Sequence, residues 1–119
     1  MIQKIEVSGV HLEIDDKISK YVNKKLGKLD KYLPKKSKLS AHLEVILKDD
    51  KKSVNHASCE AILYLPKSKI VVTEKTINIF AAIDIVEEKL KTQIRKYKEE
   101  HESLKRVSRK IKNKQKNII

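Results

Sequence analysis

The chain has 119 residues, of which 28 are lysine or arginine and 16 are aspartate or glutamate, so its formal net charge is +12 at pH 7. This length accommodates one domain with one modest core, and no apolar run approaches the ~20 residues of a membrane-spanning helix. The N-terminus shows no secretory pattern, and the single cysteine, Cys59, excludes an internal disulfide framework and a multi-cysteine zinc site. A reduced, cytoplasmic compartment is therefore expected.

The first predicted elements are a strand and a helix. Residues 2–8 alternate in polarity, which predicts a strand, and a turn is expected at 8–11. A helix is expected over 17–33, with Asp15 or Asp16 as its N-cap. Its apolar residues recur every three or four positions, as in one buried stripe: Ile18, Tyr21, Val22, Leu26, Leu29 and Leu33.

Three further strands are predicted at 39–48, 56–65 and 70–75, and a long helix begins after the cap residue Asn78 and reaches about Leu104. The resulting order β-α-β-β-β-α predicts an α+β fold. We expect one four-stranded sheet with two helices packed on one face, because strands with one apolar face need a cover. The other face of the sheet is expected to be partly exposed to solvent.

Positive charge is concentrated at the C-terminus. Residues 103–119 contain seven lysines or arginines and no acid, and residues 1–102 carry the remaining five net positive charges. We therefore expect a domain over 1–102 and a basic, flexible tail over 103–119. Such a charge favours a polyanionic partner, with nucleic acid ranked before an acidic membrane surface. The alternative is that the surface lysines only keep the protein in solution.

No catalytic or metal-binding constellation is evident, so we predict neither an enzyme nor a cofactor. Cys59 is in phase with the buried face of its strand and is interpreted as an inert core thiol. His56 and Cys59 differ in strand parity and point to opposite faces, which argues against a zinc site that includes His42.

The basic residues follow the two helices. On the first helix a stripe about 80° wide and roughly 21 Å long lies beside the apolar stripe, with Lys25 nearer the core edge. If the helices lie side by side, they form one cationic surface suited to a phosphate backbone and not to a base sequence. The candidate nucleic-acid contacts are Lys17, Lys20, Lys24, Lys25, Lys28 and Lys31 on the first helix, and Lys89, Lys91, Arg95, Lys96 and Lys98 on the second.

Several segments together resemble a known family. They are Tyr21-Val22, Lys25 to Tyr32, Glu74, Phe80 to Asp84, Lys89-Leu90 and Gln93 to Lys98. This pattern resembles the ribosome hibernation promoting factors, also called ribosome-associated translation inhibitors, over about residues 2–100. The chain departs from the family at Asn78-Ile79-Phe80, where Asp-Met-Tyr is usual, and at Thr92, where Arg is frequent.

The resemblance implies a fold related to double-stranded-RNA-binding domains and a site in the small ribosomal subunit, in the channel for messenger and transfer RNA. A member would block translation in idle or stressed cells, bind 16S-type ribosomal RNA, and be cytoplasmic and ribosome-associated. We further expect no membrane partner, no small-molecule substrate, and a monomer off the ribosome. The chain is expected to be a short form, and the matching RNA contacts are Lys25, Lys28, Lys89, Arg95, Lys96 and Lys98.

Two other function classes stay open at this point. The runner-up is a less specific RNA- or DNA-binding stress protein, and the third is a metal- or thiol-dependent enzyme. Sedimentation of a stationary-phase lysate would separate a ribosome-bound protein from a free or nucleoid-bound one.

Overall fold

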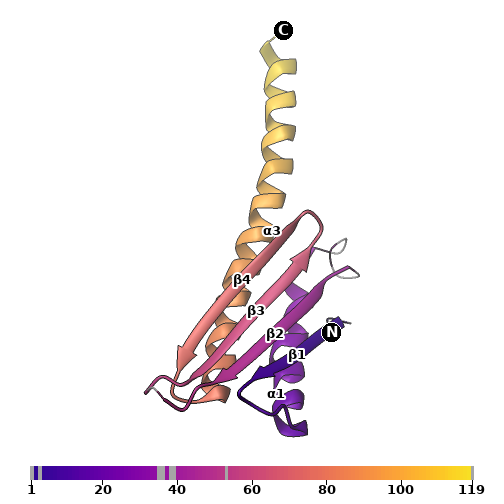
Figure 1. Ribbon diagram of the computed structural model, residues 1–119. Coiled ribbons are helices and arrows are strands. Elements are labelled where there is room, and N and C mark those ends of the chain that lie inside the picture. Colours follow the sequence, from indigo (N-terminus) through magenta and orange to yellow (C-terminus); the bar gives the residue numbers. More distant parts are fainter. Residues whose placement is uncertain (1, 3, 35–36, 38–39, 53, 119) are drawn as a thin grey trace.

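The computed structural model describes residues 2, 4–34, 37, 40–52 and 54–118, with side chains described up to residue 100. Four strands form one sheet in the order β1-β2-β3-β4, and the helices lie on one face of it (Figure 1). The predicted α+β fold is thus confirmed. The elements are β1 (Lys4–Val10), α1 (Asp16–Leu26), the 3-10 helix η1 (Gly27–Tyr32), β2 (His42–Asp49), β3 (Ala57–Leu65), β4 (Ser68–Thr76) and α3 (Ile79–Ile118).

The strand connections follow from the chain order. β1 pairs with β2 in parallel, whereas β2–β3 and β3–β4 are antiparallel hairpin pairs. A parallel pair needs a crossover connection, and α1 with η1 supplies it on the covered face of the sheet. The two helices are thereby placed side by side, because α3 follows β4 and packs on that same face (Figure 1).

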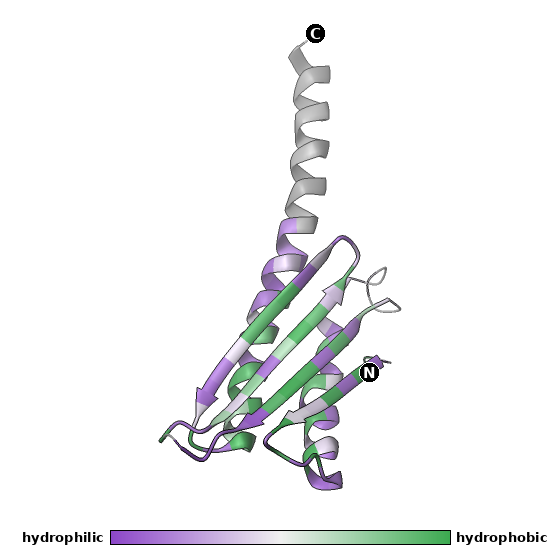
Figure 2. Ribbon diagram, in the orientation of Figure 1, coloured by the Kyte–Doolittle hydropathy of each residue, from purple (hydrophilic) through white to green (hydrophobic). Residues whose placement is uncertain are grey.

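The core lies between the sheet and the helices. Alternate residues of β2 and β3, including Leu43, Val45 and Leu63, are fully buried against the apolar stripes of the helices. Figure 2 shows hydrophobic residues on α3 where this helix lies behind the sheet. The buried residues of the helices include Ile18, Val22 and Leu26 from α1, Leu29 from η1, and Ile83, Val86, Leu90 and Ile94 from α3.

Both predicted helix caps are confirmed. The Asp15 carboxylate accepts a hydrogen bond from the backbone N–H of Ile18 at 2.8 Å, and the Asn78 side-chain oxygen accepts one from Phe80 N–H at 2.8 Å. These bonds satisfy backbone donors that have no partner within the first turn of a helix.

Two predicted element ends are corrected. β1 continues to Val10, which pairs with Lys48, so the chain turns at His11 (φ 55°) and not over 8–11. The first helix is α-helical only to Leu26, since the chain tightens at Gly27 into η1. A 3-10 turn is common at a helix C-terminus, and this one still buries Leu29.

The second half of the chain shows smaller differences. β4 begins at Ser68, so the turn before it contains only Pro66 and Lys67. α3 extends to Ile118, beyond the predicted end near Leu104. The division at residue 102 into a domain and a flexible tail stays a prediction, because the side chains beyond residue 100 lie outside the description.

Candidate nucleic-acid interface

A hollow of about 210 Å³ lies where η1 faces α3. Lys25 and Lys28 reach it from the end of α1 and the start of η1, and Lys91 reaches it from α3. The rest of its lining consists of Leu29, Lys31, Tyr32 and Glu87. Four lysines therefore line this space, and Glu87 is the only acidic residue among the described residues that line it.

Tyr32 organises the cations beside this hollow. Lys31 Nζ lies 5.1 Å from the centroid of its ring, Lys91 Nζ lies 5.3 Å away, and Arg95 Cζ lies 5.1 Å away. All three distances are within the range of cation–π attraction. Burial alone would raise the pKa of the Tyr32 phenol, but hydrogen bonding and charge from Lys31 and Lys91 outweigh it and lower the pKa.

A second cluster joins the N-terminal parts of the two helices. The Tyr21 hydroxyl donates a hydrogen bond of 2.5 Å to Asp84, and Lys25 Nζ lies 3.7 Å from the same carboxylate. The rings of Tyr21 and Phe80 meet edge to face at 5.0 Å. The hydrogen bond to Asp84, followed by burial and the charge of Asp84, raises the pKa of Tyr21 to about 12.

Two lysines of this cluster rest on the aromatic rings. Lys17 Nζ lies 5.6 Å from the centroid of Phe80, and Lys25 Nζ lies 5.6 Å from that of Tyr21. Together the two clusters place five cations on three aromatic rings.

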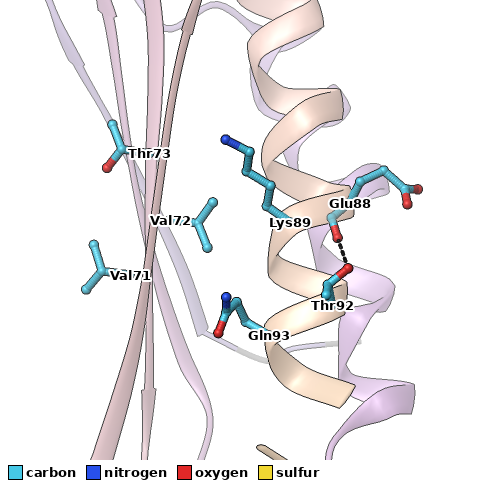
Figure 3. Close-up of a pocket in the computed structure, with 7 residues that line it drawn as sticks. All are labelled: Val71, Val72, Thr73, Glu88, Lys89, Thr92 and Gln93. Carbon is cyan, nitrogen blue, oxygen red and sulfur yellow. Dashed lines mark hydrogen bonds between the residues drawn. The ribbon is translucent and has the colours of Figure 1, made fainter. Parts of the chain in front are cut away.

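The opposite flank of α3 faces β4 and is different in character. A hollow of about 530 Å³ there is lined by Val71, Val72 and Thr73 from β4, with Lys89 and Gln93 from α3 (Figure 3). Glu88 and Thr92 also line it, and the Thr92 hydroxyl donates to the Glu88 carbonyl at 3.0 Å (Figure 3). Lys89 pairs with Glu74 of β4. Lys96 lies two turns after Lys89 and shares its side of the helix.

The predicted contact residues therefore fall into three groups. Lys25, Lys28, Lys31, Lys91 and Arg95 converge at the helix junction. Lys89 and Lys96 lie on the β4 flank of α3. The others lie along the two helices: Lys17, Lys20 and Lys24 are exposed on α1, and Lys98 is half-buried on α3 two turns after Lys91.

Sequence reasoning missed three residues of this surface. Tyr32 was assigned no role, although its ring carries three of the cations. Asp84 and Glu87 of α3 also had no assigned role, although they bring carboxylates to the lysines of this surface. Their spacing from Lys91, seven and four residues, places all three on one face of α3 and is a signal that could have found them.

The residues considered for other chemistry are separate. Cys59 is fully buried, and burial raises the pKa of its thiol to about 12. His56 Nδ1 lies 2.6 Å from the Asp49 carboxylate, and the His42 ring packs 5.4 Å from that of Tyr64. In the part of the chain that the structure describes, no group of three or more His, Cys, Asp or Glu is placed to hold a metal. Among the described helices, none has the length and hydrophobicity to cross a membrane.

Comparison with known proteins identifies a matching family and several named relatives. Residues 5–102 match the family described as Sigma 54 modulation protein / S30EA ribosomal protein. A ribosome hibernation promotion factor of Lactococcus lactis subsp. cremoris is 34% identical over 95 residues, covering 80% of this chain and 49% of that protein. A ribosome hibernation promoting factor of Pseudomonas putida is 30% identical over 101 residues, covering 85% of this chain and 92% of the relative. The chain therefore spans about half the length of the first relative.

Solved structures share the fold. The N-terminal domain of Thermus thermophilus Protein Y superposes with a TM-score of 0.65 at 33% identity, over 81% of this chain and 97% of that one. A ribosomal subunit interface protein from Coxiella burnetii gives a TM-score of 0.66 at 23% identity, over 81% of this chain and 98% of its own, and shows the same fold.

Proposed function

Because this chain belongs to the Sigma 54 modulation protein / S30EA ribosomal protein family, we propose that it is a ribosome hibernation factor. It binds the small ribosomal subunit through 16S-type ribosomal RNA in the channel for messenger and transfer RNA, and blocks translation in idle or stressed cells. Its place of action is the cytoplasmic ribosome, and its role is binding and not catalysis. Family membership confirms the predicted resemblance.

The observation that carries this proposal is the convergence of cations at the junction of α1 and η1 with α3. Ammonium and guanidinium groups neutralise backbone phosphates, and lysines in particular do so as point charges that carry little base readout. A two-helix surface with this charge suits the backbone of a folded RNA. The names of the relatives support the ribosome as the partner, a choice that the charge alone does not make.

Co-sedimentation tests the proposal directly. The purified chain should pellet with small subunits and suppress cell-free translation. Since binding releases counterions from phosphates, the logarithm of the affinity should fall with the logarithm of salt concentration, by about 0.7 to 0.9 per phosphate neutralised. A folded protein that stays in the supernatant at low salt would refute the proposal.

Two charge-matched triple variants locate the interface. Lys28, Lys31 and Lys91 lie at the helix junction, and their replacement by Gln should weaken subunit binding at least tenfold, as expected for three lost phosphate contacts. The control variant replaces three exposed lysines on the uncovered sheet face, Lys48, Lys69 and Lys75. It has the same net charge and should bind almost normally.

The same pair of variants tests the less specific alternative, a general RNA- or DNA-binding stress protein. Under that alternative, both variants would lose affinity equally, and the wild-type chain would bind duplex DNA as tightly as small subunits at equal salt. A selective loss in the helix-junction variant supports the ribosomal role.

A further inference from the structure

We propose that the hollow between η1 and α3 is a binding site for one phosphate group. The ammonium groups of Lys25, Lys28, Lys31 and Lys91 hold the phosphate, and Tyr32 positions two of them. The phosphate belongs either to an RNA backbone or to a free phosphorylated molecule. The first source deepens the proposed function and rests on it.

The size of the hollow indicates a small ligand group. Its volume is about 210 Å³, below the ~300 to 1,000 Å³ of pockets that hold drug-sized ligands. Four lysines line it, as does Leu29, the buried residue of η1. A compact, multiply charged oxyanion fits this combination of small space and polar lining better than a planar base or an apolar group.

The charge in the hollow is unbalanced. Lys25 shares the Asp84 carboxylate at 3.7 Å, and Glu87 is the only carboxylate among the described lining residues. Like charges held close together repel, and this repulsion is relieved when an anion enters between them. An anion bound in the hollow would balance the lysines whose charge Glu87 does not neutralise.

Tyr32 holds its cations without neutralising them. A carboxylate partner would cancel the charge of Lys31 or Lys91 and occupy their N–H donors. An aromatic ring attracts a cation through its quadrupole. Lys31 and Lys91 also hydrogen-bond the Tyr32 phenol, which takes one of the three N–H donors of each ammonium group and leaves the others for a further ligand. With Lys31 and Lys91 at 5.1 and 5.3 Å from the ring centroid, Tyr32 is a positioning residue for the phosphate site.

Glu87 provides a sharp test, because its negative charge repels an anionic ligand in the hollow. The full chain is titrated with inorganic pyrophosphate at constant ionic strength, and backbone amide resonances are followed by NMR. We expect saturable shifts at Lys28 to Tyr32 and at Glu87 to Lys91. Glu87→Gln should tighten binding about threefold or more, as expected for removing one nearby like charge. The control Glu88→Gln makes the same change in net charge on the β4 flank of α3 and should alter affinity less than twofold.

Small-subunit binding by the same variants identifies the source of the phosphate. If Glu87→Gln tightens both pyrophosphate and subunit binding, the phosphate belongs to RNA; if it tightens only pyrophosphate binding, the site takes free phosphorylated molecules. Both results support the site. Non-saturable shifts spread over all surface lysines, or equal effects of Glu87→Gln and Glu88→Gln, would overturn it. Subunit binding that persists in that case would leave the proposed function standing, whereas a normal pyrophosphate response without subunit binding would overturn the proposed function alone.

Discussion

Tyr21 links α1 to α3 through the hydrogen bond of its hydroxyl to Asp84. Because this bond raises the pKa of Tyr21 from 10.0 to about 12, the neutral phenol stabilises the folded state. That contribution is complete below about pH 10 and disappears as the pH rises through about 12. Tyr21→Phe should lower the free energy of unfolding by about 1 kcal/mol near neutral pH. Urea denaturation should show this difference shrinking over the alkaline range; a constant difference would contradict it.

Gly9 lies where β1 ends against the following turn. A Cβ at this position would lie 2.1 Å from the backbone carbonyl oxygen of Leu12, and a backbone atom cannot move aside as a flexible side chain does. Gly9→Ala should therefore destabilise the fold by roughly 1–3 kcal/mol. Thermal denaturation measures the effect, and Ser8→Ala, at the exposed neighbouring position, is the control that should change stability little.

Single residues were predictable where periodicity alone decides their surroundings. The strand parity of Cys59 predicted its burial, which the structure confirms. The role of Tyr32 was not predictable in this way, because its ring reaches Lys91 and Arg95 only through the tight turn of η1 and the docking of α3. Contacts of this kind depend on how two elements pack together, and the sequence periodicity of either element does not predict them.

At the scale of elements, alternation and helical stripes predicted the strands and helices, and their ends were less predictable. The parallel register of β1 with β2 extends β1 to Val10, and that register is a tertiary property. Glycine is unfavourable inside a helix, but the change from α1 to η1 at Gly27 also depends on how the last turns pack on the core.

The β3–β4 hairpin contains a residue in strained conformation. Its two-residue turn is Pro66-Lys67, and Lys67 adopts φ 61°, a left-handed conformation that favours glycine. Lys67→Gly removes the left-handed penalty of about 1–2 kcal/mol, but glycine also raises the conformational entropy of the unfolded chain, which offsets part of this gain. The substitution should therefore stabilise the protein by about 0.5 kcal/mol. Chemical denaturation tests this. The control Lys69→Gly, inside β4, should instead be destabilising.

At the scale of the molecule, the two faces differ in chemistry. The helix side gathers lysines and Arg95 around Tyr32. The uncovered sheet face also carries exposed lysines, among them Lys69 and Lys75, but carboxylates are interspersed there: Tyr64 donates to Glu44, and Thr73 donates to Glu60. The sequence predicted that both helices would cover one face and carry the basic residues. It did not predict that α3 divides these residues between two flanks, because which side of a helix meets its neighbour depends on docking.

The basic C-terminal segment provides the last prediction. Residues 105–119 carry seven of the positive charges and no acid, and the buried core described by the structure ends at Ile94. Deleting them should therefore leave the fold intact and weaken binding to small subunits. The salt dependence should become shallower by several units if most of the seven residues contact phosphates. Co-sedimentation of the full and shortened chains over a salt series measures both quantities.

The helix-junction triple variant is the control for this deletion. Its substitutions should reduce the affinity for small subunits by the same factor in either chain, since its lysines all precede the deleted segment. Unchanged affinity and an unchanged salt slope would show that the segment does not contact the ribosome.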